Sequence, residues 1–194
     1  MGRPHFAGAD FLGAARALAA DGGPAAVTVG AVSARLKAPV GSFYYRFASR
    51  DLLLGELWLE TVLAFQQGFF AALDAADGLA AALHMPAWVR GNPDDARLLL
   101  LYSRHDFIQG EWPEPLRDGV AAQARRVEAG FAQFATLTFG GSGPEALRLA
   151  QFVLADVPLA AVRTHLQRRE PPPPLVDDLV RTTYEAVVSR YRVG

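Results

Sequence analysis

The sequence predicts an all-α protein with about nine helices. Apolar residues recur at helical spacing along most of its 194 residues, no segment alternates as a strand does, and turns rich in glycine and proline separate the periodic segments. Hydrophobic residues make up 51% of the chain, which is enough to bury a substantial core.

The first three expected helices are short and closely spaced. The first covers residues 9–21 and ends at a Gly-Gly-Pro turn, which is a strong stop signal. The second opens with Thr28, whose hydroxyl suits an N-cap, and runs to residue 36. Pro39 fits the first turn of a helix but not its interior, so a third helix is expected at residues 39–47. Two short helices joined by a tight turn predict a DNA-binding helix-turn-helix.

The remaining helices form a longer body. They are expected at residues 50–74, 78–89, 94–107, 115–139, 145–169 and 175–191. Ser49 supplies an N-cap for the first of them, and Asp51 in its first turn suits the helix dipole. Pro158 predicts a kink in residues 145–169, and the prolines at 171–174 form a stiff spacer before the last helix.

Charge is unevenly divided along the chain. The net charge is -1, yet residues 1–50 hold six basic and two acidic side chains, so this segment carries +4 and residues 51–194 carry -5. A basic segment can neutralise DNA phosphates, whereas an acidic body is repelled by them. A chance fluctuation of a few charges is the alternative, and its coincidence with the helix-turn-helix argues against it. We therefore expect a DNA-binding domain at residues 1–50 and a second domain at residues 51–194.

The sequence carries no catalytic motif and no membrane signal. It has no cysteine, no apolar leader core, no run long enough to span a bilayer, and none of the HExxH, GxSxG, P-loop or dinucleotide motifs. His105-Asp106 beside Glu111 is the one arrangement suggestive of a metal, but adjacent helical residues point in different directions. We expect a cytoplasmic protein that is not an enzyme and has no cofactor or metal.

The segment at residues 28–53 resembles the N-terminal signature of the TetR/AcrR family of bacterial transcriptional regulators. The matching residues are Thr28, Val29, Val32, Leu36, Gly41, Ser42, Phe43, Tyr44, Phe47, Ser49, Arg50, Asp51 and Leu53. Lys37 stands where the family usually has a turn glycine, at a cost of about 1 kcal/mol if its φ is positive. Pro39 stands where a serine or threonine often caps the recognition helix. The resemblance implies a regulator, in most cases a repressor, that binds operator DNA as a homodimer and responds to a small effector.

The second half of the helix-turn-helix carries the residues expected on DNA. Val40, Gly41 and Ser42 are expected at base edges, through an apolar contact, a close backbone approach and a hydrogen bond respectively. Tyr44 and Arg50 are expected at phosphates, which position the protein without specifying sequence. The set is completed by Thr28, Tyr45, Arg46 and, in an N-terminal arm implied by the resemblance, Arg3, for which a disordered tail is the alternative.

Aromatic residues of the body are candidates for an effector site. Most such residues are simply core, and the functional alternative is that some line an apolar cavity between helices. The resemblance favours the cavity, because the family's C-terminal domains generally bind a small and often hydrophobic effector. The expected lining is Phe65, Phe69, Trp88, Phe131, Phe134 and Phe152, with Tyr102, His105 and Asp156 as polar groups that orient the ligand.

The last two helices carry more apolar surface than an outer pair in one chain needs. The resemblance implies that they form a four-helix dimer interface with a partner copy, and burial within one chain is the alternative. The expected interface residues are Leu149, Val153, Val157, Ala160, Ala161, Leu179, Val180, Tyr184, Val187 and Val188.

Two functions remain open after this reading of the sequence. One is a ligand-responsive transcriptional regulator. The other is an all-helical small-molecule-binding protein or enzyme that uses its N-terminal helices only for packing. Joint exposure of Tyr44, Tyr45, Arg46 and Arg50 would favour the first, because packing alone has no use for them on the surface.

Overall fold

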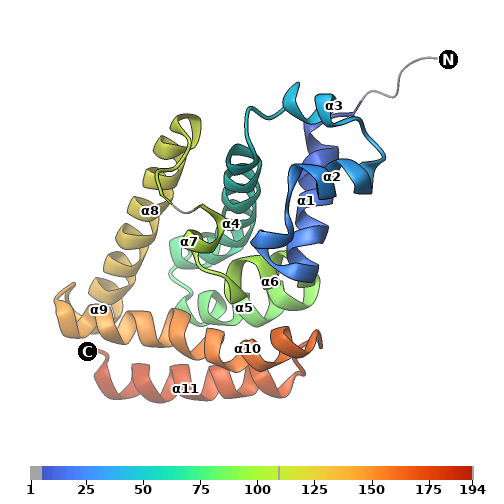
Figure 1. Ribbon diagram of the computed structural model, residues 1–194. Helices are drawn as coiled ribbons and strands as arrows, with labels where there is room; N and C mark the ends of the chain where they lie inside the picture. Colours follow the sequence, from blue (N-terminus) through green and yellow to red (C-terminus); the bar gives the residue numbers. More distant parts are fainter. Residues whose placement is uncertain (1–5, 109, 194) are drawn as a thin grey trace. The chain divides into compact units, whose positions relative to one another are not determined.

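The computed structural model describes residues 6–108 and 110–193. These residues form helices and the turns between them, without any strand, so the predicted all-α class is confirmed (Figure 1). The helices are α1 (Gly8–Gly22), α2 (Val29–Leu36), α3 (Val40–Tyr44), α4 (Arg50–Asp74), α5 (Gly78–Gly91), α6 (Pro93–Leu101), α7 (Arg104–Phe107), α8 (Glu114–Phe139), α9 (Pro144–Gln151), α10 (Val157–Arg168) and α11 (Leu175–Tyr191).

Two of the expected long helices are divided. The helix expected at residues 94–107 is α6 and α7, because Ser103 and Asp106 form a capping box that starts α7 anew. The helix expected at residues 145–169 is α9 and α10, joined by the π-helical turn η2 (Phe152–Asp156). Pro158 follows this turn and has no N–H to donate, so the wider turn is where the backbone adjusts to it.

The chain falls into two compact units. One comprises Met1–Val62 and Arg97–Val120, and the other comprises Leu63–Ala96 and Ala121–Gly194. These units do not follow the boundary at residue 50 that was expected between a DNA-binding domain and a second domain, and that functional division stays a prediction.

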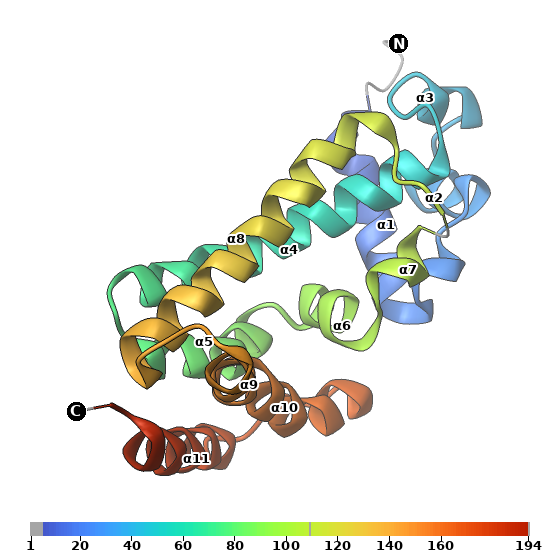
Figure 2. The ribbon, with the colours of Figure 1, turned by 90° about the vertical axis from the view of Figure 1, so that its left-hand side faces the viewer.

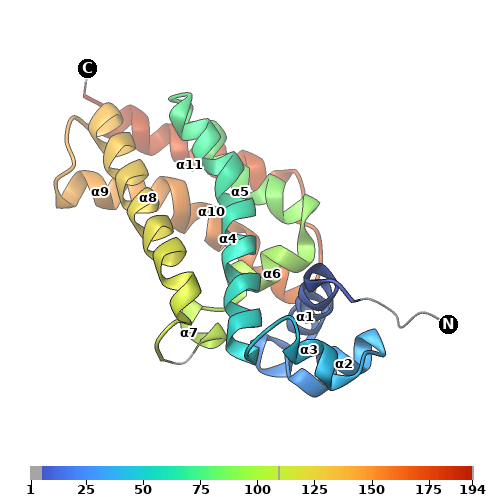
Figure 3. The same cartoon turned by 90° about the horizontal axis from the view of Figure 1, so that it is seen from above.

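The first unit packs around phenylalanines of the N-terminal helices. Phe11 of α1 meets Phe43 of α3 edge-on at 5.8 Å between ring centroids, and it meets Phe47 at 6.1 Å. Figure 3 shows α1, α2 and α3 gathered at the start of α4. Phe107 and Ile108, far along the chain, are buried in the same core. The helix-turn-helix therefore rests on residues from beyond the N-terminal segment.

The second unit is built on the later helices. α10 and α11 lie side by side against α5, and Val153 and Val180 are fully buried among them. The later half of α8 packs on the later half of α4, where the rings of Phe69 and Phe131 stack at 6.0 Å (Figure 2). Arg126 and Asp74 join the same two helices by an ion pair at 2.7 Å.

Candidate DNA-binding site

Two short helices and the turn between them form the helix-turn-helix. The hydroxyl of the exposed Thr28 accepts a hydrogen bond from the backbone N–H of Ala31 at 3.1 Å, which starts α2 where the sequence predicted. Pro39 is the residue before α3, and its φ of -59° suits the entry into a helical turn. Val32 of α2 and Phe43 of α3 are both fully buried and hold the two helices on one core.

Lys37 ends α2 in the left-handed conformation, with φ of 53° and ψ of 34°. Two backbone hydrogen bonds close the turn. The N–H of Lys37 donates to the carbonyl of Ala34 at 3.1 Å, and the N–H of Ala38 donates to the carbonyl of Ser33 at 2.9 Å. A residue with a Cβ pays about 1 kcal/mol to adopt this left-handed conformation. Glycine at position 37 would therefore be less strained than lysine.

The start of α3 presents the residues expected to read bases. Val40 is 48% exposed, Gly41 is exposed and Ser42 is half-buried. Tyr44 and Tyr45, at the end of the helix, are 57% and 82% exposed. An apolar side chain and two tyrosines this exposed around a five-residue helix are typical of a binding surface rather than of a packed core.

Arg46 lies beside this surface and is also exposed. Its Nε donates to the carbonyl of Phe6 at 3.1 Å, and its guanidinium stands over the ring of Tyr45 at 5.3 Å. The side chain is thus held in place next to the exposed tyrosines. Arg3, expected in an N-terminal arm, lies outside the described residues.

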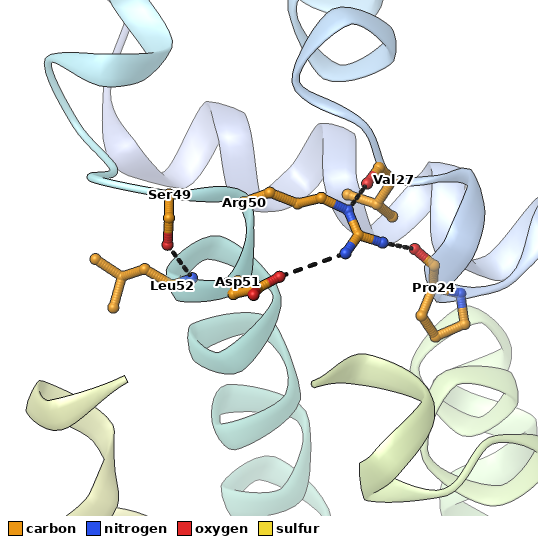
Figure 4. Close-up of polar contacts among 6 residues, drawn as sticks. All are labelled: Pro24, Val27, Ser49, Arg50, Asp51 and Leu52. Carbon is orange, nitrogen blue, oxygen red and sulfur yellow. Dashed lines mark hydrogen bonds and ion pairs between the residues drawn. The ribbon is translucent and has the colours of Figure 1, made fainter. Parts of the chain in front are cut away.

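Arg50 has a structural task that the sequence did not reveal (Figure 4). It is the first residue of α4, and its guanidinium donates to the backbone carbonyl of Val27 and, at 2.9 Å, to that of Pro24. A third contact, at 3.4 Å, reaches the carboxylate of Asp51. The half-buried side chain therefore ties the start of α4 to the segment just before α2. Long-range backbone partners of this kind leave no local sequence pattern.

Four of the expected effector residues meet in the second unit. The ring of Phe65 lies 6.0 Å from that of Phe69 and 5.1 Å from that of Trp88, and Phe69 stacks on Phe131. We call Phe65, Phe69, Trp88 and Phe131 the aromatic cluster. Phe134 is buried in the same unit, but its ring neighbours are Phe139 and Tyr184.

The other expected effector residues are placed differently. Phe152 and Asp156 are exposed on η2 and do not belong to the aromatic cluster, because their side of this turn faces away from the core. Tyr102 and His105 are members of the first unit, where Tyr102 packs against Gly23 and His105 is exposed.

His84 of α5 contacts the aromatic cluster, although it was not among the expected effector residues. Its Nε2 lies 2.8 Å from the carbonyl oxygen of Phe65, and its ring lies 5.1 Å from the Phe65 ring. Burial lowers the pKa of His84 below its ordinary value, and the Phe65 carbonyl partly opposes this shift. Gly68 makes room for the imidazole, since a Cβ there would lie 2.3 Å from the His84 ring. The glycine at position 68, inside a long predicted helix, was the one feature of the sequence that could have indicated a side chain packed closely against this helix.

A groove of about 790 Å³ lies beside the aromatic cluster. Its lining is Leu63, Ala64, Gln66, Gln67, Phe70, Ala71, Asp74, Ala122, Gln123 and Arg126, from α4 and α8. The ring of Phe70 lies 5.3 Å from that of Phe69, which connects the groove to the cluster. Oε1 of Gln66 is buried without a hydrogen-bond partner among the described residues, so it is an acceptor that lacks a donor.

The expected dimer interface needs correction at two residues. Val153 and Val180 are 1% and 0% exposed, so their own chain covers them and they have no surface to offer a partner. Leu179 is 55% exposed and Ala160 is exposed. The half-buried remainder of the set is Leu149, Val157, Ala161, Tyr184, Val187 and Val188. Leu175, one turn before Leu179, is 61% exposed and was not in the expected set.

Residues 6–108 and 110–193 contain neither a candidate metal site nor a candidate membrane span. No three histidine or acidic side chains gather there as a metal site requires. Among the helices in these ranges, none combines the length and the apolar character that crossing a membrane demands.

Comparison with known proteins finds a family match in the N-terminal helices and a shared fold over the whole chain. Residues 11–57 match the family described as bacterial regulatory proteins, tetR family. A transcriptional regulator from Rhodococcus sp. Rha1 is similar in fold, with 14% identity, a TM-score of 0.72 and coverage of 97% of this chain and 100% of that one. A transcriptional regulator from Aquifex aeolicus VF5 shows 16% identity and a TM-score of 0.65, with coverage of 93% of this chain and 98% of that one. The ketosteroid transcriptional regulator KstR2 of Mycobacterium tuberculosis shows 15% identity and a TM-score of 0.61, with coverage of 100% of this chain and 98% of that one.

The chain has no match among curated protein sequences. The solved structures share its fold at low identity, and the family match falls on the helix-turn-helix itself. The resemblance predicted from residues 28–53 is therefore confirmed for the helix-turn-helix, and the chain as a whole shares the fold of these transcriptional regulators.

Proposed function

We propose that this protein is a repressor that binds operator DNA as a homodimer and is released by a small apolar effector. The observation that carries the proposal is the exposed surface of α3, where Val40, Tyr44 and Tyr45 stand out while Phe43 anchors the helix from beneath. Chromosomal DNA is the partner, which places the protein in the cytoplasm.

On DNA, α3 is the recognition helix. Its first residues, Val40, Gly41 and Ser42, read base edges in the major groove, and each specific contact discriminates by about 1–3 kcal/mol. Tyr44, Tyr45 and Arg46 flank them and hold phosphates, with Thr28 at the start of α2. N-terminal helices used only for packing would not expose Tyr44, Tyr45 and Arg46 together. Arg50 was expected to be exposed together with these residues, but its side chain is half-buried and donates to backbone carbonyls.

The homodimer is supported by the outer helices of the second unit. Leu175 and Leu179 lie one turn apart on α11 and are both more than half exposed, an apolar stripe that a partner copy would cover. Two recognition helices in such a dimer engage two half-sites about 34 Å apart, or a multiple of that distance.

The effector site is the groove together with the aromatic cluster. The groove is of the size that small-molecule sites have. Half of its lining side chains are polar, yet most of the surface it exposes is apolar, and together with the unmet Gln66 acceptor this favours a largely apolar molecule with one hydrogen-bond donor. Contact between Phe70 and Phe69 lets a bound molecule disturb the cluster. To release most of the protein from DNA, the effector must prefer the released state by about 3–5 kcal/mol, which burial of a medium-sized apolar molecule supplies.

Fluorescence anisotropy with labelled genomic fragments tests the DNA-binding surface. The double variant Tyr44→Ala/Tyr45→Ala should weaken binding at least tenfold without lowering the free energy of unfolding. Leu137→Ala, which removes an equally exposed apolar side chain from α8, is the matched control and should bind as wild type does. Equal binding by the double variant and wild type would contradict the proposal.

A further inference from the structure

Lys37 is the only lysine of the chain, whose other 18 permanently charged cations are arginines. It occupies the turn between α2 and α3, three residues before the first residue of the recognition helix. Its side chain is exposed. Three features therefore coincide at one position: a left-handed backbone, a positive charge and adjacency to the proposed DNA surface.

The backbone at Lys37 would be relaxed by glycine. A φ of 53° places Cβ close to the following carbonyl, a conflict that glycine avoids. The TetR-family signature that this segment resembles usually has glycine at this turn. Strain of this kind is retained at functional sites when the side chain supplies something in return. For Lys37, the interaction that compensates for the strain has to be made by the ammonium group or by the aliphatic part of the side chain.

The charge of Lys37 is not used within the described part of the chain, where its ammonium makes neither an ion pair nor a hydrogen bond. Other cations of the same segment are engaged. Arg16 pairs with Glu60, and Arg46 and Arg50 donate to backbone carbonyls. Of the described cations up to residue 50, Lys37 and Arg35 alone keep their charge uncommitted.

We propose that Lys37 contacts a DNA phosphate next to the bases that α3 reads, and that the chain keeps a strained backbone for the sake of this contact. The proposal rests on the DNA-binding function proposed above. A lysine suits the task, because its ammonium is a compact charge on a flexible stem that can follow the phosphate without a fixed bidentate geometry. The contact supplies affinity but no sequence preference.

Such a contact predicts opposite effects of one substitution on stability and on DNA binding. Lys37→Gly removes both the strain and the charge. The melting temperature should equal that of wild type or exceed it by up to about 3 °C. The slope of log affinity against log salt should become shallower by about one per protomer. The wild-type advantage in affinity should therefore grow about threefold per protomer between 200 and 50 mM salt.

Further variants separate charge from strain. Lys37→Gln keeps the strained backbone and loses the charge, so it should lose the salt slope without gaining stability. Lys37→Arg keeps both and should retain the slope. Arg169→Gly is the matched control, because Arg169 also has a positive φ, of 59°, and lies in the other unit; its variant should leave DNA affinity and slope unchanged.

A chemical test uses the uniqueness of the lysine. The N-hydroxysuccinimide ester of acetic acid acylates amines, and the only other amine in the chain is the N-terminus, which peptide mass analysis distinguishes. At low salt, a selected operator fragment should protect Lys37 from acylation, and so should an unrelated duplex of 30 base pairs. Acylated protein should bind with the salt slope of Lys37→Gln.

The outcomes assign failure to one claim or the other. If wild type binds DNA, but Lys37→Gly and Lys37→Gln keep its salt slope and bound DNA leaves Lys37 open to acylation, the phosphate contact is refuted while the DNA-binding function stands. If wild type binds neither genomic nor unrelated DNA, the proposed function fails, and the contact fails with it.

Discussion

The guanidinium of Arg50 donates a hydrogen bond to the backbone carbonyl of Val27, twenty-three positions earlier in the chain. Val27 precedes the cap of α2, and Arg50 begins α4, so one side chain joins the starts of two helices. A second bond, to the carbonyl of Pro24, uses another donor of the same planar group. The orientation of the helix-turn-helix on α4 depends on this fork.

Replacing Arg50 therefore tests a positioning role. Arg50→Ala leaves two carbonyls without their donor and should lower the free energy of unfolding by about 1–2 kcal/mol. Arg50→Lys keeps the charge but lacks the fork, so it should lose nearly as much. Denaturant unfolding measures both. Equal stability of Arg50→Lys and wild type would show that the charge alone matters, and a salt slope reduced by about one in Arg50→Ala would show that Arg50 also holds a phosphate.

Val40 should influence which bases are preferred. Its exposed apolar side chain can meet only apolar surface such as a thymine methyl, so Val40→Ala should change the preference at the affected position by about 1 kcal/mol. Binding to a library with that position randomised measures the change, and affinity for unrelated DNA should stay as it is. An unaltered preferred sequence would assign base reading to another element.

The neutral state of His84 should make stability depend on pH. Its pKa in the folded chain lies below the ordinary value of 6.5, so the unfolded chain takes up a proton first as pH falls. The stability that His84 contributes is thus present above pH 6.5 and declines below it. The difference in free energy of unfolding between wild type and His84→Gln should shrink or reverse from pH 7.5 to pH 5.5. A constant difference across this range would contradict the shift.

Gly68 should be intolerant of alanine because of its neighbour. A Cβ there would lie 2.3 Å from the His84 ring, so Gly68→Ala should destabilise by about 1–3 kcal/mol although alanine favours helices. Gly13→Ala in α1, where a Cβ meets nothing within 4 Å, should stabilise by up to about 1 kcal/mol. The pair Gly68→Ala/His84→Ala should recover part of the loss. Without recovery, the intolerance has a different cause.

Phe131 should control access of the effector. Its ring stacks on Phe69 in the aromatic cluster, so Phe131→Trp should fill space that a bound molecule needs. Titration with the apolar fluorophore 1-anilinonaphthalene-8-sulfonate should show weaker uptake, while DNA affinity stays at the wild-type level. If the variant fails to fold, or takes up the fluorophore as wild type does, Phe131 is core and the effector binds elsewhere.

Local signals in the sequence located the helix-turn-helix closely. The cap at Thr28 and the proline at position 39 each fix a helix start through the backbone of neighbouring residues. Contacts distant in sequence left no such trace. The Arg50 fork, the pairing of His84 with the Phe65 carbonyl and the burial of Phe107 with the N-terminal helices all join residues far apart in the chain.

Periodicity also failed to tell one apolar surface from another. Val180 and Leu179 are neighbours on α11, and both fit an apolar pattern, yet the first is core and the second is exposed. A helix that is apolar on two sides does not show which side its own chain covers. The dimer surface was for this reason predicted only in part.

The most direct test of the central claim is selection of bound fragments from a random DNA pool by the full chain. We expect enrichment of one inverted repeat whose half-sites are about 10 base pairs apart centre to centre, or a multiple of that. Val40→Ala should enrich a repeat that differs at symmetric positions. A pool that shows no enriched sequence after repeated rounds, with wild-type protein folded and dimeric, would contradict sequence-specific recognition by α3.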